Sequence, residues 1–328
     1  MGRPVFQVIN PGVFTTIQAG PRKGYFASGI PPSGAMDRFS LRMGNLLVKN
    51  PLEEAGLEVT GVGVKLVALT ETVVALSGAD FRMRVNGRSI SPWRTILVKK
   101  NDVLQMESPL TGWRAYLAVA GGFDVPEVLG SKSTYTLGGL GGFKGRVLKK
   151  GDILEAGEPR DELTKLLGRL VKEDSLLTPT SVRELRVVLG PQDDHVQSES
   201  IETFLTTKYQ VSIHSNRVGY RFQGAQLFFQ KREQSKDAGS DPSNIVDDGN
   251  AIGAIQVPAG KEAICLGPDG VTMGGYVKIA CLITADMDRL AQLRPRDQIS
   301  FKGVTIDEAR DILLDSMGQV REENLIRE

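Results

Sequence analysis

The chain has few of the residues that build metal centres or disulfide frameworks. Its 328 residues include two cysteines and two histidines. His195 and His214 lie far apart, and no cluster with Cys265 or Cys281 has metal-ligand spacing, so we expect no metal site. Both cysteines lie in apolar segments, which favours buried free thiols in a reducing compartment.

Targeting and membrane signals are also missing. No long apolar run occurs, which predicts that no helix spans a membrane. Residues 1–12 lack the apolar core of a signal peptide, and Phe6 replaces the Ser or Thr that myristoylation requires. The net charge is +1 with interspersed signs, which argues against a nucleic-acid or membrane surface. We therefore expect a cytoplasmic protein.

Common nucleotide and nucleophile motifs are absent as well. There is no Walker A loop and no Gly-x-Ser-x-Gly elbow. Residues 138–145 are rich in glycine, which is a weak phosphate signal and fits a tight connection between strands. Ser33-Gly34 precedes a helix start at Asp37 and offers backbone donors, but the acidic cap opposes an anion there.

What the sequence does have is glycine, 37 residues of it, between short apolar segments. Residues 81–85 alternate apolar and basic before Asn86-Gly87, which predicts a hairpin because both turn residues tolerate positive φ. Many short strands with turn signals predict a mainly β protein built from sandwiches or barrels. Further strands are expected at residues 73–76, 116–120, 185–189, 264–266 and 279–283.

Helices are expected to be few. Asp37 can cap a helix through Leu47, and Thr305 with Glu308 forms a capping box before a terminal helix. Further helical segments are predicted at 162–172, 198–206 and 286–293. The charged run 172–175 suggests two domains, 1–180 and 181–328. The polar stretch 230–250 reads as a long surface loop, either an insertion or a lid.

The most informative segment is GGYVKIA, residues 274–280. Its two glycines permit close backbone approach. On a strand, Tyr276 and Lys278 share one face, while Val277 and Ile279 take the other. This arrangement suits a strand that lines an anion-binding pocket, and it equally fits a half-buried strand with a solvated lysine.

Two arginines and an amide are further candidates. Arg217 and Arg221 lie four residues apart, so on a strand they face the same way and could clamp a carboxylate or phosphate. The alternative is a pair of surface arginines with acidic neighbours. Gln256 lies between apolar residues, so it could bind a substrate amide or hold a loop. His214 is a weaker candidate for proton transfer.

Motifs along nearly the whole chain resemble the allophanate hydrolase subunit 2 family, also called biotin-dependent carboxyltransferase, KipA-like or the 5-oxoprolinase C subunit. The resemblance includes the segment from Asn45 through Asn50-Pro51 to Leu57-Glu58. The longer matching motifs are ASGIPPSGAMD (27–37), YLAVAGGF (116–123), GSKST (130–134), GGLGGFKGR (138–146), GPQ (190–192), SNRVGYR (215–221), GAIQVPAG (253–260), GGYVKIA (274–280) and LAQLRPRD (290–297).

The resemblance implies two β-barrel-like domains, the C-terminal one cyclophilin-like, with a few short helices. Fold alone does not imply prolyl isomerase activity. It also implies one subunit of an ATP-dependent 5-oxoprolinase that opens 5-oxoproline to glutamate. The partners would be a KipI-like protein (the 5-oxoprolinase B subunit) and a LamB/YcsF-like protein (the 5-oxoprolinase A subunit). ATP would bind at the level of the hetero-oligomeric complex.

Two other functions remain open. The first is the carboxyltransferase component of a biotin-dependent urea or amide carboxylase, which needs a separate biotin carrier because this chain has no Met-Lys-Met signal. The second is a KipA-like antagonist that binds a kinase inhibitor.

One segment departs from the family pattern. The family reads Asp-Arg-Gln-Thr-Thr-Gly-Gly-Tyr-Pro-Lys-Ile, whereas residues 269–279 read DGVTMGGYVKI. Arg and Gln are lost, and Pro268-Asp269-Gly270 becomes a good turn. The acidic segment 246–249, VDDG, stands where Ser-Glu-Gly is expected. Lys278 and Asp269 are retained.

From the resemblance, Lys278 would stabilise charge on a carbonyl oxygen. Asp269 would orient that lysine or polarise a substrate N–H. Substrate binding would fall to the remaining candidates, which are Arg217, Tyr220, Arg221, Gln256 and Tyr276. Ser33 and Asp37 would serve as a turn and a helix cap.

Overall fold

The computed structural model describes residues 2–176, 184–233 and 236–328, which form two compact units. Unit 1 comprises Met1–Lys23, Ser33–Thr180 and Gly318–Glu328, and unit 2 comprises Gly24–Pro32 and Ser181–Met317. The expected boundary at residue 180 lies outside the described residues. The observed division differs from a single cut at that position in two ways. Residues 24–32 belong to unit 2, and residues 318–328 belong to unit 1.

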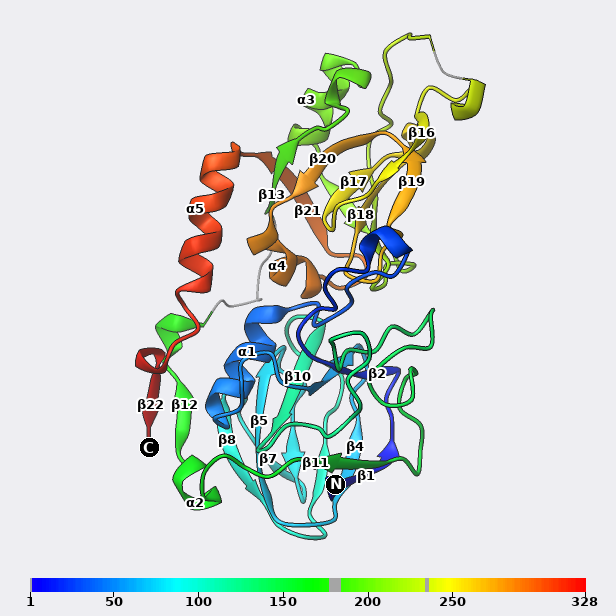
Figure 1. Ribbon diagram of the computed structural model, residues 1–328. Helices are drawn as coiled ribbons and strands as arrows, with labels where there is room; N and C mark the ends of the chain where they lie inside the picture. The colour runs from blue at the N-terminus through cyan, green and yellow to red at the C-terminus, as the bar shows by residue number, and fades with distance from the viewer. Residues whose placement is uncertain (1, 177–183, 234–235) are drawn as a thin grey trace. The chain divides into compact units, whose positions relative to one another are not determined.

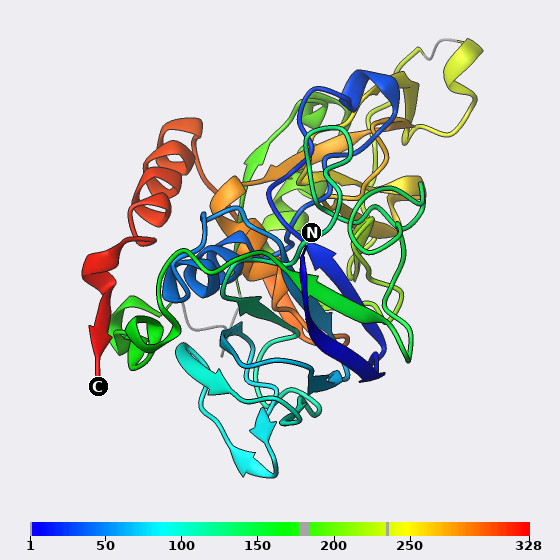
Figure 2. The ribbon, with the colours of Figure 1, turned by 60° about the horizontal axis from the view of Figure 1, so that its bottom comes forward.

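Unit 1 is built from two antiparallel sheets (Figures 1 and 2). The first has the strand order β11 (Ile153–Ala156), β1 (Arg3–Asn10), β4 (Lys65–Ala68), β9 (Val103–Gln105), β6 (Arg84–Val85) and β7 (Arg88–Ser89). The second has the order β2 (Phe14–Gln18), β3 (Gly56–Thr60), β10 (Arg114–Val119), β5 (Thr72–Gly78), β8 (Arg94–Val98), β12 (Arg169–Val171) and β22 (Leu325–Arg327).

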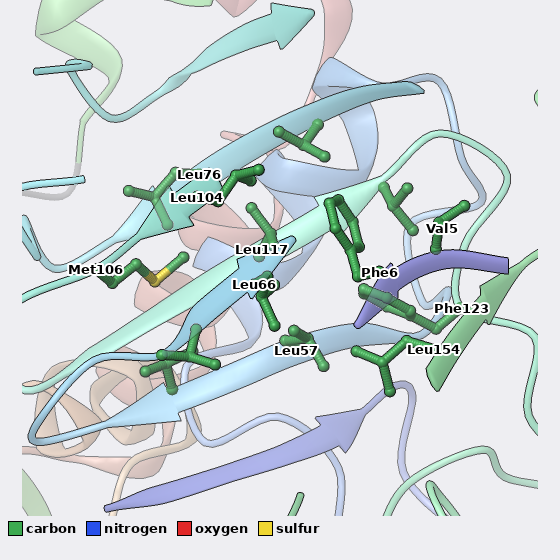
Figure 3. Packing of buried hydrophobic residues seen from close by; sticks show 14 of the residues in the cluster. Val5, Phe6, Leu57, Leu66, Leu76, Leu104, Met106, Leu117, Phe123 and Leu154 are labelled. Atoms are coloured by element: carbon green, nitrogen blue, oxygen red, sulfur yellow. The ribbon is translucent and has the colours of Figure 1, made fainter. Parts of the chain in front are cut away.

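The main core of unit 1 takes side chains from both sheets. Leu117 of β10 lies directly opposite Leu57 of β3 and Leu76 of β5, and all three leucines are fully buried in one cluster (Figure 3). Phe6 and Leu66 of the other sheet belong to the same cluster. Successive side chains of a strand point to opposite faces of the sheet, so alternate residues of β3, β5 and β10 contribute to this cluster.

The opposite face of the second sheet is covered by α1 (Arg38–Leu47). Val73 and Ala75 of β5 pack in a second cluster with Phe39 and Met43 of this helix. Asp37 caps the helix: its side chain accepts a hydrogen bond from Ser40 N at 2.8 Å. The expected helix and its acidic cap are thus confirmed.

Unit 2 contains a closed barrel. Its strands follow the order β13 (Glu184–Leu189), β20 (Lys278–Leu282), β17 (Ala254–Gln256), β18 (Glu262–Leu266), β15 (Gly219–Gln223), β14 (Tyr209–Val211) and β21 (Gln298–Gly303). Aromatic rings fill part of the interior: Phe301 stacks on Phe204 at 4.5 Å between ring centroids and meets Phe222 edge-on. The predicted mainly β fold is confirmed.

A two-stranded ribbon and several helices complete unit 2. The ribbon pairs β16 (Asn244–Gly249) with β19 (Met273–Tyr276). The helices are α3 (Ser198–Thr206), α4 (Met287–Ala291) and α5 (Ile306–Met317). Within the described part of the chain, no helix is long and apolar enough to cross a membrane.

Single-turn 3-10 helices occur in both units. They are η1 (Phe26–Ser28), η2 (Glu173–Ser175), η4 (Asp193–His195), η5 (Lys236–Ala238), η6 (Pro258–Gly260), η7 (Thr284–Asp286) and η8 (Glu322–Asn324).

Most local sequence signals are confirmed. Thr305 and Glu308 exchange the capping-box hydrogen bonds at the start of α5. Asn86 and Gly87 have positive φ between β6 and β7. All five expected strands overlap observed strands, namely β5, β10, β13, β18 and β20.

Two local predictions are wrong. The helix expected at 162–172 is a single turn, α2 (Leu163–Leu166), followed by β12, because Gly168 takes a φ of 72° and redirects the chain. The polar stretch 230–250 is not only a loop, since it contains β16. The sequence of β16 lacks alternating apolar residues, so its pattern did not predict a strand.

Replacing Leu117 by Ala should lower the free energy of unfolding of unit 1 by about 2–5 kcal/mol, because the change leaves a cavity in the core. Both tryptophans, Trp93 and Trp113, lie in unit 1. Tryptophan emission during urea unfolding therefore reports on this unit. The matched control is Leu137→Ala, whose side chain is 71% exposed. It should change stability by less than about 0.5 kcal/mol, and equal effects of the two changes would contradict the assignment.

Candidate functional site

The register of four barrel strands sorts the candidate residues into two rows. Tyr220, Cys265, Ile255 and Ala280 are consecutive partners across β15, β18, β17 and β20. All four are at most 1% exposed, so this inner row faces the barrel interior. The inner row therefore belongs to the core.

The adjacent position on β15, β18 and β17 forms the outer row, and on β20 a register shift brings Lys278, two residues before Ala280, into the same row. Arg221 pairs with Ile264, Ile264 with Gln256, and Gln256 with Lys278. Directly opposed residues of antiparallel strands share a face, so a cation, an amide and a second cation lie along the outside of the barrel. With strands about 4.8 Å apart, Arg221 and Lys278 are separated by roughly 14 Å along the row.

Lys278 occupies the end of the outer row that the β16–β19 ribbon covers. Its side chain is 3% exposed, and Nζ lies 2.9 Å from Oδ2 of Asp248 on β16. An ammonium has three N–H donors, and Asp248 takes one. In the described ranges, we find no second partner for Nζ. Lys278 therefore has donor capacity for a further acceptor.

Gln256 lies beside Lys278 and is 5% exposed. Its Nε2 donates to Asn250 Oδ1 at 3.0 Å. A Cβ on Gly274 would lie 3.2 Å from this Nε2 and 3.0 Å from Asn250 Nδ2. The glycine thus allows the ribbon backbone to approach the two amides closely, as the sequence suggested.

Gln192 completes the group. Its Oε1 accepts from Lys278 N at 3.1 Å, and its Nε2 lies 3.4 Å from Asp248 Oδ2. We call these five residues the lysine–amide cluster: Gln192, Asp248, Asn250, Gln256 and Lys278. Sequence reasoning found Lys278 and Gln256 but missed the other three. Gln192 ends the quoted GPQ motif, which was the available signal.

The ion pair of the lysine–amide cluster lowers the pKa of Asp248. The hydrogen bond from Lys278 is the largest cause, and the backbone N–H of Gly249 adds to it. The carboxylate itself is half exposed. It therefore remains ionised in mildly acidic solution and keeps Lys278 paired.

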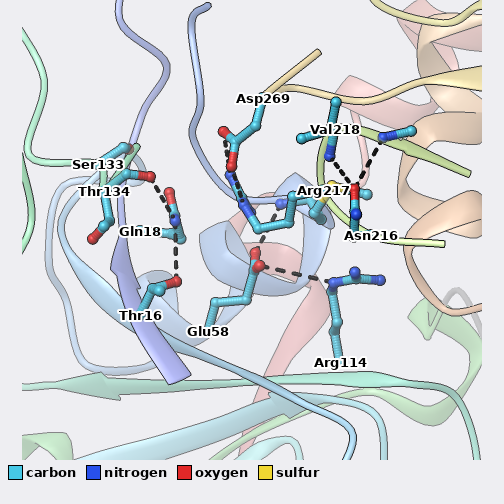
Figure 4. Close-up of polar contacts among 12 residues, drawn as sticks. Thr16, Gln18, Glu58, Arg114, Ser133, Thr134, Asn216, Arg217, Val218 and Asp269 are labelled. Atoms are coloured by element: carbon cyan, nitrogen blue, oxygen red, sulfur yellow. Dashed lines mark hydrogen bonds and ion pairs between the residues drawn. The ribbon is translucent and has the colours of Figure 1, made fainter. Parts of the chain in front are cut away.

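Asp269 does not orient Lys278, contrary to expectation. It pairs with Arg217, whose Nε and Nη2 lie 2.8 and 3.1 Å from the two carboxylate oxygens (Figure 4). Both side chains are at most 5% exposed. The hydrogen bond from Gly270 N to Gly267 O closes the predicted turn around Asp269. This buried bidentate pair fastens the turn to the segment before β15.

Arg217 and Arg221 do not form a joint clamp. Arg217 precedes β15 and is buried against Asp269, whereas Arg221 lies on β15 and pairs with Glu262 at 2.8 Å. The Arg221 side chain is 44% exposed. The expected common strand face fails because the strand begins at Gly219, after Arg217.

Two tyrosines are placed differently from expectation. Tyr220 is an inner-row residue, 1% exposed, with its hydroxyl 3.4 Å from Leu293 O. Tyr276 ends β19 and is 40% exposed. It does not share a strand face with Lys278, because β19 ends at Tyr276 and a new strand, β20, begins after Val277.

The end of the ASGIPPSGAMD motif, residues 33–37, is tied into unit 1 by buried hydrogen bonds. Glu58 Oε2 accepts from Met36 N at 2.9 Å and from the Tyr116 hydroxyl at 2.7 Å. Burial, with the nearby Glu58 carboxylate as the next cause, raises the pKa of Tyr116 well above its ordinary value. Ser33 is buried with a φ of 55°. These roles agree with the structural ones expected for Ser33 and Asp37.

The glycine-rich segment 138–146 packs on the GSKST motif of unit 1. A Cβ on Gly142 would lie 1.8 Å from Thr134 Oγ1, and one on Gly141 would lie 2.2 Å from Ser133 O. Glycine is therefore required for close packing. Figure 4 shows the adjacent polar contacts of Gln18 with Thr16.

Within ranges 2–176, 184–233 and 236–328, no three His, Cys, Asp or Glu side chains are grouped to hold a metal ion. Cys265 and Cys281 are free thiols, and burial raises the pKa of both.

Comparison with known proteins places this arrangement in a family. Residues 28–303 match the carboxyltransferase domain, subdomain A and B. The 5-oxoprolinase C subunit of Escherichia coli is 37% identical, over 93% of this chain and 93% of that protein. Urea amidolyase of Lachancea kluyveri is 36% identical over 94% of this chain, which spans only 17% of that protein's length.

A solved structure agrees with this assignment. The Kluyveromyces lactis urea carboxylase superposes with a TM-score of 0.90 at 33% identity, over 99% of this chain and 30% of that one. The chain belongs to the carboxyltransferase domain family.

Removing one partner of the buried pair in unit 2 should be costly. We expect Asp269→Asn to lower the free energy of unfolding by about 3–5 kcal/mol, because Arg217 keeps its charge without the matching carboxylate. Glu262→Gln makes the same chemical change in an exposed pair and should cost less than about 1 kcal/mol. Thermal and urea unfolding followed by circular dichroism would compare them. A larger loss for Glu262→Gln would refute the burial argument.

The pKa of Asp248 should depend on Lys278. Because its folded-state pKa is lowered, the pair contributes stability above the ordinary aspartate pKa of about 3.9. That contribution is lost as pH falls through the folded-state pKa. A carbon-13 NMR titration should show a lowered pKa for Asp248, restored by Lys278→Met. Asp161, whose pKa is lowered by Lys49, is the internal control and should not change. An unaltered Asp248 titration in the variant would disprove the coupling.

Proposed function

We propose that this chain is a subunit of an ATP-dependent amidohydrolase complex of the 5-oxoprolinase type, with the lysine–amide cluster at its substrate site. The observation that carries the proposal is the pairing of Lys278 with Gln256 beneath the ribbon. Relatives named as the 5-oxoprolinase C subunit, from Escherichia coli and Haemophilus influenzae, align over nearly their whole length and support it.

The proposed substrate is 5-oxoproline, a cyclic amide. When its carbonyl is attacked, negative charge develops on the oxygen, and a preorganised ammonium stabilises that charge. Lys278 Nζ is held by Asp248 and has further donors to offer. The Oε1 atom of Gln256 would accept the ring N–H while its Nε2 remains on Asn250. The lysine would thus bind the carbonyl oxygen of the substrate amide, and the glutamine would bind its N–H.

Other assignments follow from the geometry. Arg217 is engaged by Asp269 and holds the framework, so it is not assigned to the substrate carboxylate. Arg221 lies too far along the outer row to grip the same small molecule. Tyr276, exposed at the end of β19, is the proposed contact for the rest of the substrate. ATP would bind at the level of the complex, with KipI-like and LamB/YcsF-like partner proteins.

A second candidate rests on the family itself. Members named urea amidolyase and urea carboxylase share the fold and about a third of the sequence. Under this alternative, the chain is a carboxyltransferase component that receives the carboxyl group from a biotin carrier. Lys278 would then stabilise charge on a carboxylated amide.

Lys278→Met should lower 5-oxoproline-dependent ATP hydrolysis by about 10²–10³-fold in the complex reconstituted with both partner proteins, as expected for loss of a charge-stabilising donor. Lys302→Met removes an exposed lysine of the same unit and should leave the rate unchanged. Size-exclusion chromatography would verify that both variants assemble.

Two outcomes would count against this proposal. Full activity of Lys278→Met in an assembled complex would remove the lysine from catalysis and place the reacting site elsewhere. No 5-oxoproline turnover, together with carboxyl transfer from an added biotin carrier to urea or another amide, would favour the carboxylase function.

A further inference from the structure

A second polar site lies on unit 2 at the Arg221 end of the outer row. It is a pocket of about 640 Å³ that opens to solvent. We call it the loop pocket, and it is lined by Ile213, His214, Ser215, Asn216, Arg221 and Glu262. None of these residues belongs to the lysine–amide cluster.

The loop that forms one wall is fixed by hydrogen bonds to β15. Ser212 N donates to Arg221 O at 2.8 Å, and Arg221 N donates to Ser215 Oγ at 3.0 Å. Asn216 Oδ1 accepts from Val218 N at 2.8 Å and from Gly219 N at 3.3 Å (Figure 4). Because both backbone groups hold the oxygen of this amide, its Nδ2 donors point away from the turn. The pocket wall is therefore preorganised.

The other wall presents both signs of charge. Arg221 Nη1 bonds Glu262 Oε2 at 2.8 Å, which occupies one edge of each group. Over the described parts of the chain, neither Nη2 of Arg221 nor Oε1 of Glu262 has another partner. The pocket thus offers guanidinium and amide donors together with a carboxylate acceptor.

We propose that the loop pocket binds the zwitterionic group of a free α-amino acid. The ligand's carboxylate would lie between Arg221 and the Asn216 amide, since guanidinium groups favour carboxylates. Its ammonium would bond Glu262, and its side chain would extend along Ile213 and His214. A simple anion fits less well, because Glu262 would repel it at close range.

This inference does not rest on the proposed function. It concerns a pocket roughly 14 Å along the outer row from Lys278, and it is tested by binding to the chain alone. If the chain also serves in a reaction that yields an amino acid, the same pocket would respond to its product.

The test is isothermal titration calorimetry with L-glutamate and L-alanine as probes. Glutarate carries carboxylates but no ammonium, and inorganic phosphate is the anion control. We expect saturable binding of both amino acids and at least about tenfold weaker binding of glutarate and phosphate, since each lacks a charge-assisted hydrogen bond. Arg221→Met and Glu262→Gln should each weaken amino-acid binding by about tenfold or more.

Two control variants locate the binding event. Lys302→Met, in an exposed ion pair with Glu184, should have no effect, and Lys278→Met should leave the binding of L-alanine unchanged. Loss of L-alanine binding in Lys278→Met would place the ligand in the lysine–amide cluster and overturn the assignment. Equal binding of phosphate or glutarate, or tighter anion binding by Glu262→Gln, would identify a plain anion site. Absence of saturable amino-acid binding would also overturn the proposal.

Discussion

The register of the unit 2 barrel is the constraint on which the candidate chemistry depends. A one-residue slip of β15 would exchange Tyr220 with Arg221, placing a guanidinium among the aromatic rings of the core and a phenol outside. The cost of burying that charge fixes the register. The same alignment carries Gln256 to the outer row, whereas Lys278 reaches this row through the register shift between β17 and β20.

The Arg217–Asp269 and Arg221–Glu262 pairs of unit 2 have different roles because their burial differs. The Arg217–Asp269 pair is shielded from solvent and uses both carboxylate oxygens, so its geometry is fixed and its loss is expensive. The Arg221–Glu262 pair remains partly solvated and uses one oxygen. A pair of the second kind contributes little to stability but keeps hydrogen-bonding capacity for a ligand.

The sequence predicted what is encoded locally. The cap at Asp37, the capping box at Thr305 and the Asn86-Gly87 turn each depend on neighbours within a few residues. Arg217 and Asp269 are 52 residues apart, and Lys278 and Asp248 are 30 apart. No local pattern predicts which carboxylate pairs with which cation, since the pairing depends on the strand order and on the separation of β19 from β20 at Val277. Lys278 and Gln256 were identified because strand alternation and the family motif agree on them.

The departure from the family pattern at residues 270 and 271 can be understood from this framework. Gly270 closes the turn that presents Asp269 to Arg217, and Val271 is 52% exposed. Neither position supplies a side chain to the lysine–amide cluster. Val271 touches the cluster through its backbone, because its carbonyl accepts from Asn250 Nδ2 at 3.3 Å, and any residue offers that oxygen. The absence of the Arg and Gln that the resemblance led us to expect at these positions therefore leaves intact the contacts that hold Lys278 and Gln256.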